Sequence, residues 1–289
     1  MLFNRQKELI YMIEKLHRSG KTKIQKLLFL STINEDNCPY DFFPYNYGPY
    51  SIELQHDLDR LCKDEILTIS IDQYTVNHTP LLKISNARKA RLDDVFNKFG
   101  NYNTHDLIKY VYTNYPQYAI NSIKAKELLT SGEMDRVTKC KSNQCERTLF
   151  TIGYEHKSID KYLHQLIENN IHTLIDVRAN SYSMKREFIG KNLAHQCNFL
   201  GIEYLHMPEV GIPTEYRKKS TSKAELFKIY KEDLLPQHKG RIGEMIKLLD
   251  ERKRVALTCF EASYGECHRN ILAEEIEKCS KGTVPLVHL

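Results

Sequence analysis

The feature that most constrains the fold is the alternation of strand-like and helix-like segments from residue 148 to the C-terminus. Short apolar runs such as 149–153 alternate with stretches such as 158–170, in which apolar residues have the spacing of a helix. Strands that alternate with helices build a mostly parallel sheet flanked by helices. We therefore predict an α/β domain over residues 148–289. Its predicted strands are 149–153, 172–178, 202–207, 254–260 and 284–289.

Residues 1–147 have a different pattern, in which helical spacing dominates. The predicted helices are 4–18, 23–33, 51–64, 86–99, 104–115 and 121–129. Two short strands are predicted at 66–71 and 81–85, so this half is expected to be a mainly helical, winged-helix-like domain. Such domains bind DNA in many proteins and bind partner proteins in others. The polar segment that begins at Thr130 is predicted to be a linker, with the domain boundary near Arg147.

Charge and composition set further bounds. The chain has 42 lysines and arginines against 37 aspartates and glutamates, and the net charge of +5 is compatible with nucleic-acid binding. No apolar run approaches the roughly 20 residues of a membrane span. Charged residues throughout the first segment argue against a signal peptide. The eight cysteines are scattered through the chain, so we expect reduced thiols in a cytoplasmic protein.

The segment YNYGPYSIELQHDLDRL (45–61) resembles the helical domain of Panacea-type antitoxins and their phage-associated relatives. In that family an aromatic-rich segment of this kind precedes a helix. The resemblance covers about residues 5–90 and supplies no catalytic residue. It implies a setting in mobile elements or in defence, with a partner protein, a second copy or DNA bound through this half.

Ionisable and aromatic side chains follow the ends of four predicted strands in the second half. The carboxyl ends of parallel strands lie at one edge of a sheet, and ligands of α/β folds bind there. We therefore predict a functional site at this edge. The side chains that gather there are Tyr154, Asp176, Arg178, His206, Glu261, Cys259, Cys267, His268 and Arg269.

Four sequence blocks at these positions resemble the family catalogued as domain of unknown function 488. The blocks are TIGYEHKSIDKYLHQL (151–166), IDVRANSYSMKREF (175–188), YLHMPEVG (204–211) and LTCFEASYGECHRNILAE (257–274). They occur in the order of that family and with natural spacing, over about residues 148–289. The resemblance implies an α/β fold with a clustered polar site. Metal binding and nucleic-acid-related roles have both been suggested for the family, so the resemblance does not identify the reaction.

Carboxylate chemistry on DNA is the first hypothesis for this site. Asp176 and Glu261 would orient or deprotonate a water molecule, and Arg178 and His268 complete the predicted catalytic set. An enzyme that acts on a base must bring it out of the stack, and removing the base requires a carboxylate beside a cationic sugar. We therefore expect a hydrolase, a DNA glycosylase that removes a base, in particular a modified one. A role in antiviral defence is implied only by the family resemblances. No cofactor is expected.

The DNA contacts are predicted from basic residues that alternate with aromatic ones. This combination suits contact with the phosphate backbone together with stacking of bases. The predicted nucleic-acid-binding residues are Arg269, Lys185, Arg186, Tyr154 and Tyr182. The same lysine and arginine could instead form a solvated face, and Asp176 could simply form a salt bridge with Arg178.

A metal site is the runner-up. Cys259, Cys267 and His268 offer zinc ligands, and His206 could add a fourth. The C-x₇-C spacing, however, lacks the tight pairs of structural zinc sites, and neighbouring residues at a helix start rarely both face one ion. Cys140 and the following Cys145 have better spacing, but no second pair follows closely.

Two thiol interpretations also stay open. Cys267 could be a nucleophile, because it precedes a predicted helix whose N-terminus favours a thiolate. A phosphatase-like loop is not matched, since Cys259 to Arg269 is C-x₉-R and not C-x₅-R. The cysteines could also only pack in the core. The alternative functions are a non-catalytic regulator that binds DNA and senses a metal or ligand, and a nuclease.

Overall fold

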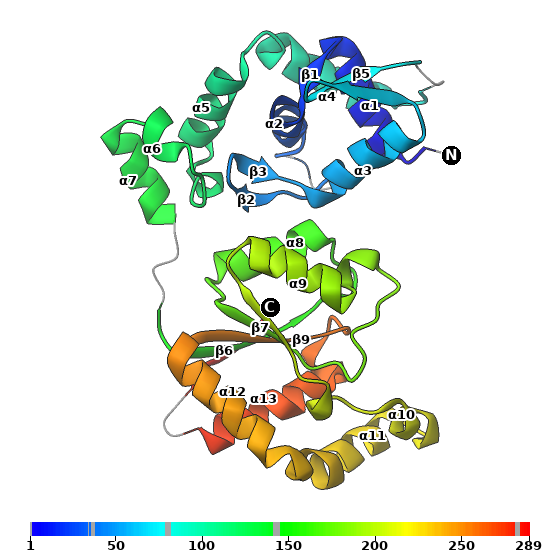
Figure 1. The fold of residues 1–289 in the computed structure, drawn as a ribbon, viewed down its shortest axis with the longest axis vertical. Coiled ribbons are helices and arrows are strands. Elements are labelled where there is room, and N and C mark those ends of the chain that lie inside the picture. Colours follow the sequence, from blue (N-terminus) through cyan, green and yellow to red (C-terminus); the bar gives the residue numbers. More distant parts are fainter. Residues whose placement is uncertain (1, 34, 36–37, 79–81, 141–144, 281–283) are drawn as a thin grey trace. The chain divides into compact units, whose positions relative to one another are not determined.

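The computed structural model of the protein describes residues 2–33, 35, 38–78, 82–140, 145–280 and 284–289. The chain forms two compact units, Met1–Lys141 and Ser142–Leu289 (Figure 1). The division falls a few residues before Arg147, where the sequence analysis places it. Each unit has its own hydrophobic core. Within the described ranges, no helix is long and apolar enough to cross a membrane.

The N-terminal unit is mainly helical. Its core is formed by apolar residues that recur at helical spacing, such as Leu9 and Ile13 on the first helix and Leu54, Leu58 and Leu61 on the third. Its elements are α1 (Asn4–Leu16), β1 (Ser19–Gly20), α2 (Lys21–Thr32), β2 (Phe43–Tyr45), β3 (Gly48–Tyr50), α3 (Ile52–Lys63), β4 (Leu67–Ser70), β5 (Gln73–Val76), α4 (Asn86–Phe99), α5 (Thr104–Asn114), the 3₁₀ turn η1 (Pro116–Tyr118), α6 (Ala125–Leu128) and α7 (Ser131–Cys140).

The first strand predicted for this unit, 66–71, is present as β4, but its hairpin partner is β5 and not the predicted segment 81–85. β4 pairs antiparallel with β5, and β5 pairs antiparallel with β1. The turn between β4 and β5 is Ile71-Asp72, with φ of 51° and 55°. Asn-Gly is the favoured sequence for such a turn, so Ile-Asp gave no signal of it. The prediction of a strand at 81–85 is wrong for Leu82–Ser85, which are not in a strand, while residue 81 lies outside the described residues.

The polar segment predicted to be a linker contains helix α7. Thr130 and Glu133 cap its start reciprocally: the Thr130 amide donates to Glu133 Oε2 (2.9 Å), and the Glu133 amide donates to Thr130 Oγ1 (3.4 Å). Val137 is buried and Met134 packs on the core. The linker prediction is therefore wrong for residues 131–140, because this helix needs only a narrow apolar stripe.

The C-terminal unit is an α/β fold, as predicted. Its five strands have the order β10-β6-β9-β7-β8, and every neighbouring pair is parallel. The elements are β6 (Thr148–Gly153), α8 (Ile159–Glu168), β7 (Thr173–Asp176), η2 (Arg186–Phe188), α9 (Gly190–Phe199), β8 (Glu203–His206), η3 (Pro208–Val210), α10 (Thr214–Lys219), α11 (Lys223–Ile229), the π-helical η4 (Tyr230–Leu234), η5 (Leu235–His238), α12 (Lys239–Arg252), β9 (Arg254–Cys259), η6 (Tyr264–Glu266), α13 (His268–Cys279) and β10 (Leu286–His288).

Helices cover both faces of this sheet. α8 and α9 lie on one side, and α12 and α13 lie on the other (Figure 1). Successive residues of a strand face opposite sides, so Val255 and Leu257 join the core under α12 and α13. On the other face, Tyr162 of α8 donates a hydrogen bond to Thr258 Oγ1 (2.8 Å). Because β6, β7 and β9 are buried on both faces, each contains consecutive apolar residues and not a strict alternation of apolar and polar ones.

Candidate functional site

The loops at the carboxyl edge of the sheet are bonded to one another. The Glu155 amide, after β6, donates to Phe260 O (2.9 Å), and the Ala262 amide, after β9, donates to Glu155 Oε2 (2.9 Å). Lys185, in the loop after β7, donates through Nζ to Lys157 O (2.8 Å). The edge identified from the sequence therefore brings three distant segments of the chain together.

Gly153 makes this close approach possible at the end of β6. A Cβ atom at this position would lie 1.8 Å from the carbonyl oxygen of Glu261, so any other residue would displace the loop. Arg269 fixes the same loop, because its Nη1 donates to Glu261 O (2.5 Å) and its Nη2 to Ala262 O (3.2 Å). The glycine and the arginine together set the position of Glu261.

Asp176 and Arg178 form a buried ion pair. Arg178 Nε and Nη2 donate to the two carboxylate oxygens (2.8 and 2.5 Å), and Tyr204 donates to Asp176 Oδ2 (2.6 Å). Burial disfavours the charged guanidinium, but the bonds and charge of Asp176 outweigh it and raise the pKa of Arg178. Asp176 has 0% exposed surface. The salt bridge with Arg178 that the sequence analysis left open is therefore present, and Asp176 fixes Arg178 and Tyr204, while its catalytic role stays a prediction.

Two of the residues predicted to contact nucleic acid are enclosed. Tyr154 is 2% exposed, stacks on Phe188 with ring centroids 4.4 Å apart, and accepts a hydrogen bond from Arg178 Nη1 (2.7 Å). Arg269 is 1% exposed, and its guanidinium donates hydrogen bonds to the backbone carbonyls of Glu261 and Ala262. The structure thus corrects the expectation that these two side chains contact a partner at the surface.

The other three predicted contacts lie in the loop after β7. Tyr182 and Arg186 are exposed, whereas Lys185 is half-buried and bonded to backbone carbonyls. Only Tyr182 and Arg186 therefore offer their side chains fully to solvent.

Glu261 is the predicted carboxylate that remains at the surface of the edge. It is half-buried and follows the exposed Phe260. Cys259 Sγ donates to its Oε2 (3.3 Å), and no ion pair among the described residues includes it. Burial, followed by the charge of Cys267, raises the pKa of Glu261. The two predicted carboxylates thus differ in their partners. Asp176 is bonded to Arg178 and Tyr204, whereas Glu261 accepts a hydrogen bond from the Cys259 thiol and forms no ion pair among the described residues.

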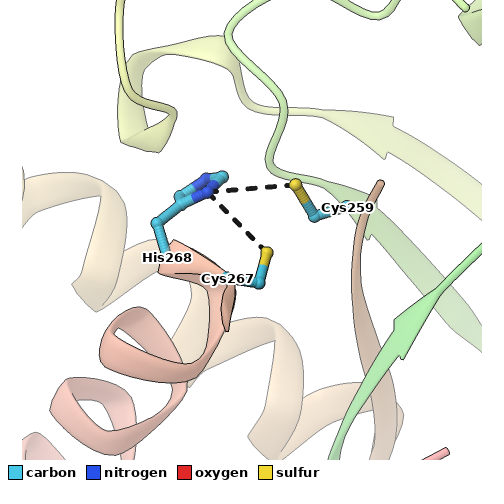
Figure 2. Close-up of side chains that lie close together, drawn as sticks. All are labelled: Cys259, Cys267 and His268. Carbon is cyan, nitrogen blue, oxygen red and sulfur yellow. Dashed lines mark hydrogen bonds between the residues drawn. The ribbon is translucent and has the colours of Figure 1, made fainter. Parts of the chain in front are cut away.

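Cys259, Cys267 and His268 converge beside Glu261, with their side chains directed toward one another (Figure 2). His268 Nδ1 lies 3.9 Å from each sulfur, and the three possible ligand atoms lie within 4.8 Å of one another. His268 Nε2 lies 3.1 Å from Val177 O. Because a carbonyl only accepts, Nε2 carries the proton and the Nδ1 lone pair faces the sulfurs.

Two neighbouring residues face one point because the backbone changes conformation between them. Cys267 is the N-cap of α13 and is extended, with φ −131° and ψ 137°, while His268 is the first helical residue. Adjacent residues at a helix start rarely both face one point, and this change of backbone conformation is what allows it here. His206 does not join them: its Nε2 lies 2.8 Å from Arg178 O.

The two thiols have pKa values that move in opposite directions. The hydrogen bond with Cys267 and burial raise the pKa of Cys259. Burial acts in the same sense on Cys267, but opposing effects, of which the hydrogen bond from Cys259 is the largest, outweigh it and lower the pKa of Cys267. The pair therefore favours a thiolate at Cys267 beside a thiol at Cys259.

A shallow depression of about 680 Å³ lies elsewhere, at the amino ends of the strands. It is lined by residues such as His172, Glu203 and Arg252. We place the site at the carboxyl edge instead, because the titratable side chains converge there and the depression is an open groove between charged surface residues.

The comparisons with known proteins agree with part of the sequence analysis. No curated protein and no solved structure matched the chain. The family model described as "Domain of unknown function DUF488" matches residues 158–276, a range that begins just before α8 and ends within α13. This match supports the resemblance predicted for the C-terminal half.

Proposed function

We propose that the C-terminal unit is a hydrolase that removes a base, in particular a modified base, from DNA. The observation that carries this proposal is the state of Glu261: a half-buried carboxyl group at the carboxyl edge, outside the ion pairs of the described residues. Hydrolysis of an N-glycosidic bond requires a carboxylate that stabilises a cationic sugar or activates water. Both carboxylate oxygens of Asp176 already accept hydrogen bonds from Arg178 and Tyr204, so Glu261 takes this role.

The surface around Glu261 supports a nucleic acid as the substrate. Exposed apolar side chains stand on the edge loops, and a base removed from the stack needs such surfaces on either side. Arg186 is exposed on one of these loops and would contact a phosphate. The exposed apolar residues are Phe260 (44%), Tyr264 (49%), Tyr182 (67%) and Met184 (96%).

In this proposal Asp176 is a positioning residue. Its bonds orient Arg178, which reaches Tyr154 Oη (2.7 Å) and Phe188 O (3.1 Å). The loop that exposes Tyr182 and Arg186 therefore rests on a buried ion pair. A change at Asp176 acts on this loop through the guanidinium.

For the N-terminal unit we propose a winged-helix-like module in an anti-phage protein. Three helices, α1 to α3, accompany the three-stranded sheet β1-β5-β4, and the β4–β5 hairpin is the wing. The wing exposes Ile69 (50%) and Ile71 (86%). The resemblance to Panacea-type antitoxins favours the same setting. DNA is the proposed partner, and a protein or a second copy is the alternative.

The test uses the full-length protein on DNA duplexes that carry plain or modified bases, followed by alkali, which cuts abasic sites. We expect alkali-dependent cleavage of modified DNA. Glu261→Gln should lower base release by about 10² or more, the scale of a positioned acid–base group. Glu266→Gln is the matched control, because Glu266 is an exposed carboxylate of the same loop that pairs with Lys223 (3.1 Å).

The outcomes separate the candidate functions. Base release by Glu261→Gln at the wild-type rate would contradict the proposal. Cleavage without alkali would point to a nuclease. Binding of DNA without any product, in wild type and variants alike, would favour the non-catalytic regulator, for which the Cys-Cys-His cluster is the supporting observation.

A further inference from the structure

We propose that Cys259 Sγ, Cys267 Sγ and His268 Nδ1 bind one Zn²⁺ ion, and that the fourth position holds a water molecule next to Glu261. The three side chains come from the end of β9 and the start of α13 and point toward a common centre (Figure 2).

The spacing of the ligand atoms fits a tetrahedral zinc site. Bond lengths of about 2.3 Å for sulfur and 2.0–2.1 Å for nitrogen place N and S about 3.6 Å apart around one ion. The two N···S separations here are each 3.9 Å. A small rotation of the side chains closes the difference of a few tenths of an ångström.

The surroundings of His268 are those of a metal ligand. A zinc-bound histidine donates its second ring N–H to a carbonyl or carboxylate, which fixes both tautomer and orientation. His268 Nε2 meets this condition at Val177 O (3.1 Å). Tyr230 packs edge-on against the imidazole, with centroids 5.3 Å apart, and is itself anchored at Val210 O (2.7 Å). The ring therefore presents Nδ1 to the sulfurs before any ion arrives.

Burial and charge favour a soft divalent cation. The three ligand residues are at most 2% exposed. Zinc binds cysteine as thiolate, and two thiolates in an enclosed place require compensating positive charge. Zn²⁺ supplies that charge in full, and the N-terminus of α13 adds to it. Mg²⁺ and Ca²⁺ prefer oxygen ligands and do not suit this set.

The fourth position distinguishes this site from a structural one. Three protein ligands leave one place open, as in catalytic zinc sites, and a bound water there becomes a hydroxide near neutral pH. Glu261 Oε2 lies 3.3 Å from Cys259 Sγ, within reach of such a water. Two cysteines, a histidine and a non-ligand glutamate are also the set by which zinc deaminases attack nucleobases. Only the use of the water, not the binding of the ion, rests on the proposed function.

The test measures metal on the full-length protein without DNA. The protein is stripped with a chelator, reloaded with Zn²⁺ or Co²⁺, and analysed for metal per chain by mass spectrometry. We expect one ion per chain, and thiolate-to-cobalt charge-transfer absorption in the Co²⁺ form. Cys259→Ser and Cys267→Ser should each lose most of the ion and of this absorption. Glu261→Gln should keep the ion, because its carboxylate is not a ligand.

Control variants make the result specific. Cys197→Ser changes an equally buried thiol outside the cluster, and the double variant Cys140→Ser/Cys145→Ser removes the other close cysteine pair. Both should bind metal as the wild type does. Circular dichroism shows whether each variant is folded.

Several results would overturn the inference, and the first three concern metal content. They are a reloaded wild type without metal, loss of metal from the Cys140/Cys145 variant, and loss of metal from a folded Glu261→Gln protein. Should Cys259→Ser and Cys267→Ser not fold, the wild-type protein still decides: Co²⁺ bound without thiolate charge-transfer absorption contradicts the ligand set. Since no DNA is used, failure of base release leaves this result intact.

Discussion

At the scale of single residues, the sequence predicts which side chains lie at the carboxyl edge of the sheet. It does not predict which partners from other loops form hydrogen bonds with them. The end of a strand identifies which side chains reach the edge, and Asp176, Glu261 and His268 were found in this way. Whether a side chain is free depends on partners from other loops. Asp176 is saturated by Tyr204 from β8, and Tyr154 is covered by Phe188 from the loop after β7. Single-sequence patterns carry no information on such long-range partners.

The buried ion pair gives a prediction at this scale. Asp176→Asn leaves the Arg178 guanidinium buried without its counter-charge, so the free energy of unfolding of the C-terminal unit should fall by about 3–5 kcal/mol. Asp250→Asn is the control, because its pair with Arg147 is partly exposed and should be worth about 0–1 kcal/mol. Urea unfolding followed by circular dichroism measures both. Equal small losses would show that Asp176 is not structural and would restore it as a catalytic candidate.

At the scale of elements, regular patterns were predictable and local turn chemistry was not. The central strands β6, β7 and β9 contain consecutive apolar residues because both of their faces are buried. Helix α4 begins and ends where its spacing indicates, at Asn86 and Phe99. The β4–β5 hairpin was not predicted, because its turn residues Ile71 and Asp72 adopt positive φ although neither is a glycine or an asparagine. Helix α7 was not predicted, because the polar segment that begins at Thr130 has the composition of a linker. Its Thr130-x-x-Glu133 sequence is in fact a capping box.

Two glycines allow a matched test of the loop that presents Glu261. Gly153→Ala places a methyl group 1.8 Å from a backbone oxygen of that loop, so the loop must move. We expect loss of stability by more than 1 kcal/mol, as for other overpacked positions, together with loss of base release and of bound metal. Gly243→Ala is the control: nothing lies within 4 Å of its added Cβ, and it lies inside α12. It should stabilise by about 0.5–1 kcal/mol. Thermal unfolding and metal analysis compare the stability and the metal content of the two variants. Unchanged metal content in a folded Gly153→Ala protein would contradict the role of Gly153 in positioning this loop.

At the scale of the whole molecule, the change of pattern near residue 147 predicted two parts because each part buries its own apolar residues. The N-terminal core draws on residues from Leu2 to Val137, and the C-terminal core on residues from Leu149 to Leu286, with no member in common. The order of the strands was not predictable. β9 lies between β6 and β7, although two strands (β7 and β8) separate it from β6 in the sequence and one strand (β8) separates it from β7. That insertion is what brings Cys259 and Glu261 beside the end of β7.

Separate cores predict that the two units unfold independently. Residues 1–141 and 142–289, expressed alone, should each fold, since chains of this length bury enough surface for a stable core. The sum of their circular dichroism spectra should equal that of the full chain.

In the full chain, Zn²⁺ should raise only the unfolding midpoint that belongs to residues 142–289, because a ligand stabilises the unit that binds it. The expected gain is about 2.7 kcal/mol at a hundredfold excess over Kd. Cys267→Ser should abolish this shift and leave the other midpoint in place. A single transition that shifts as a whole with Zn²⁺ would mean that the two units form one cooperative structure.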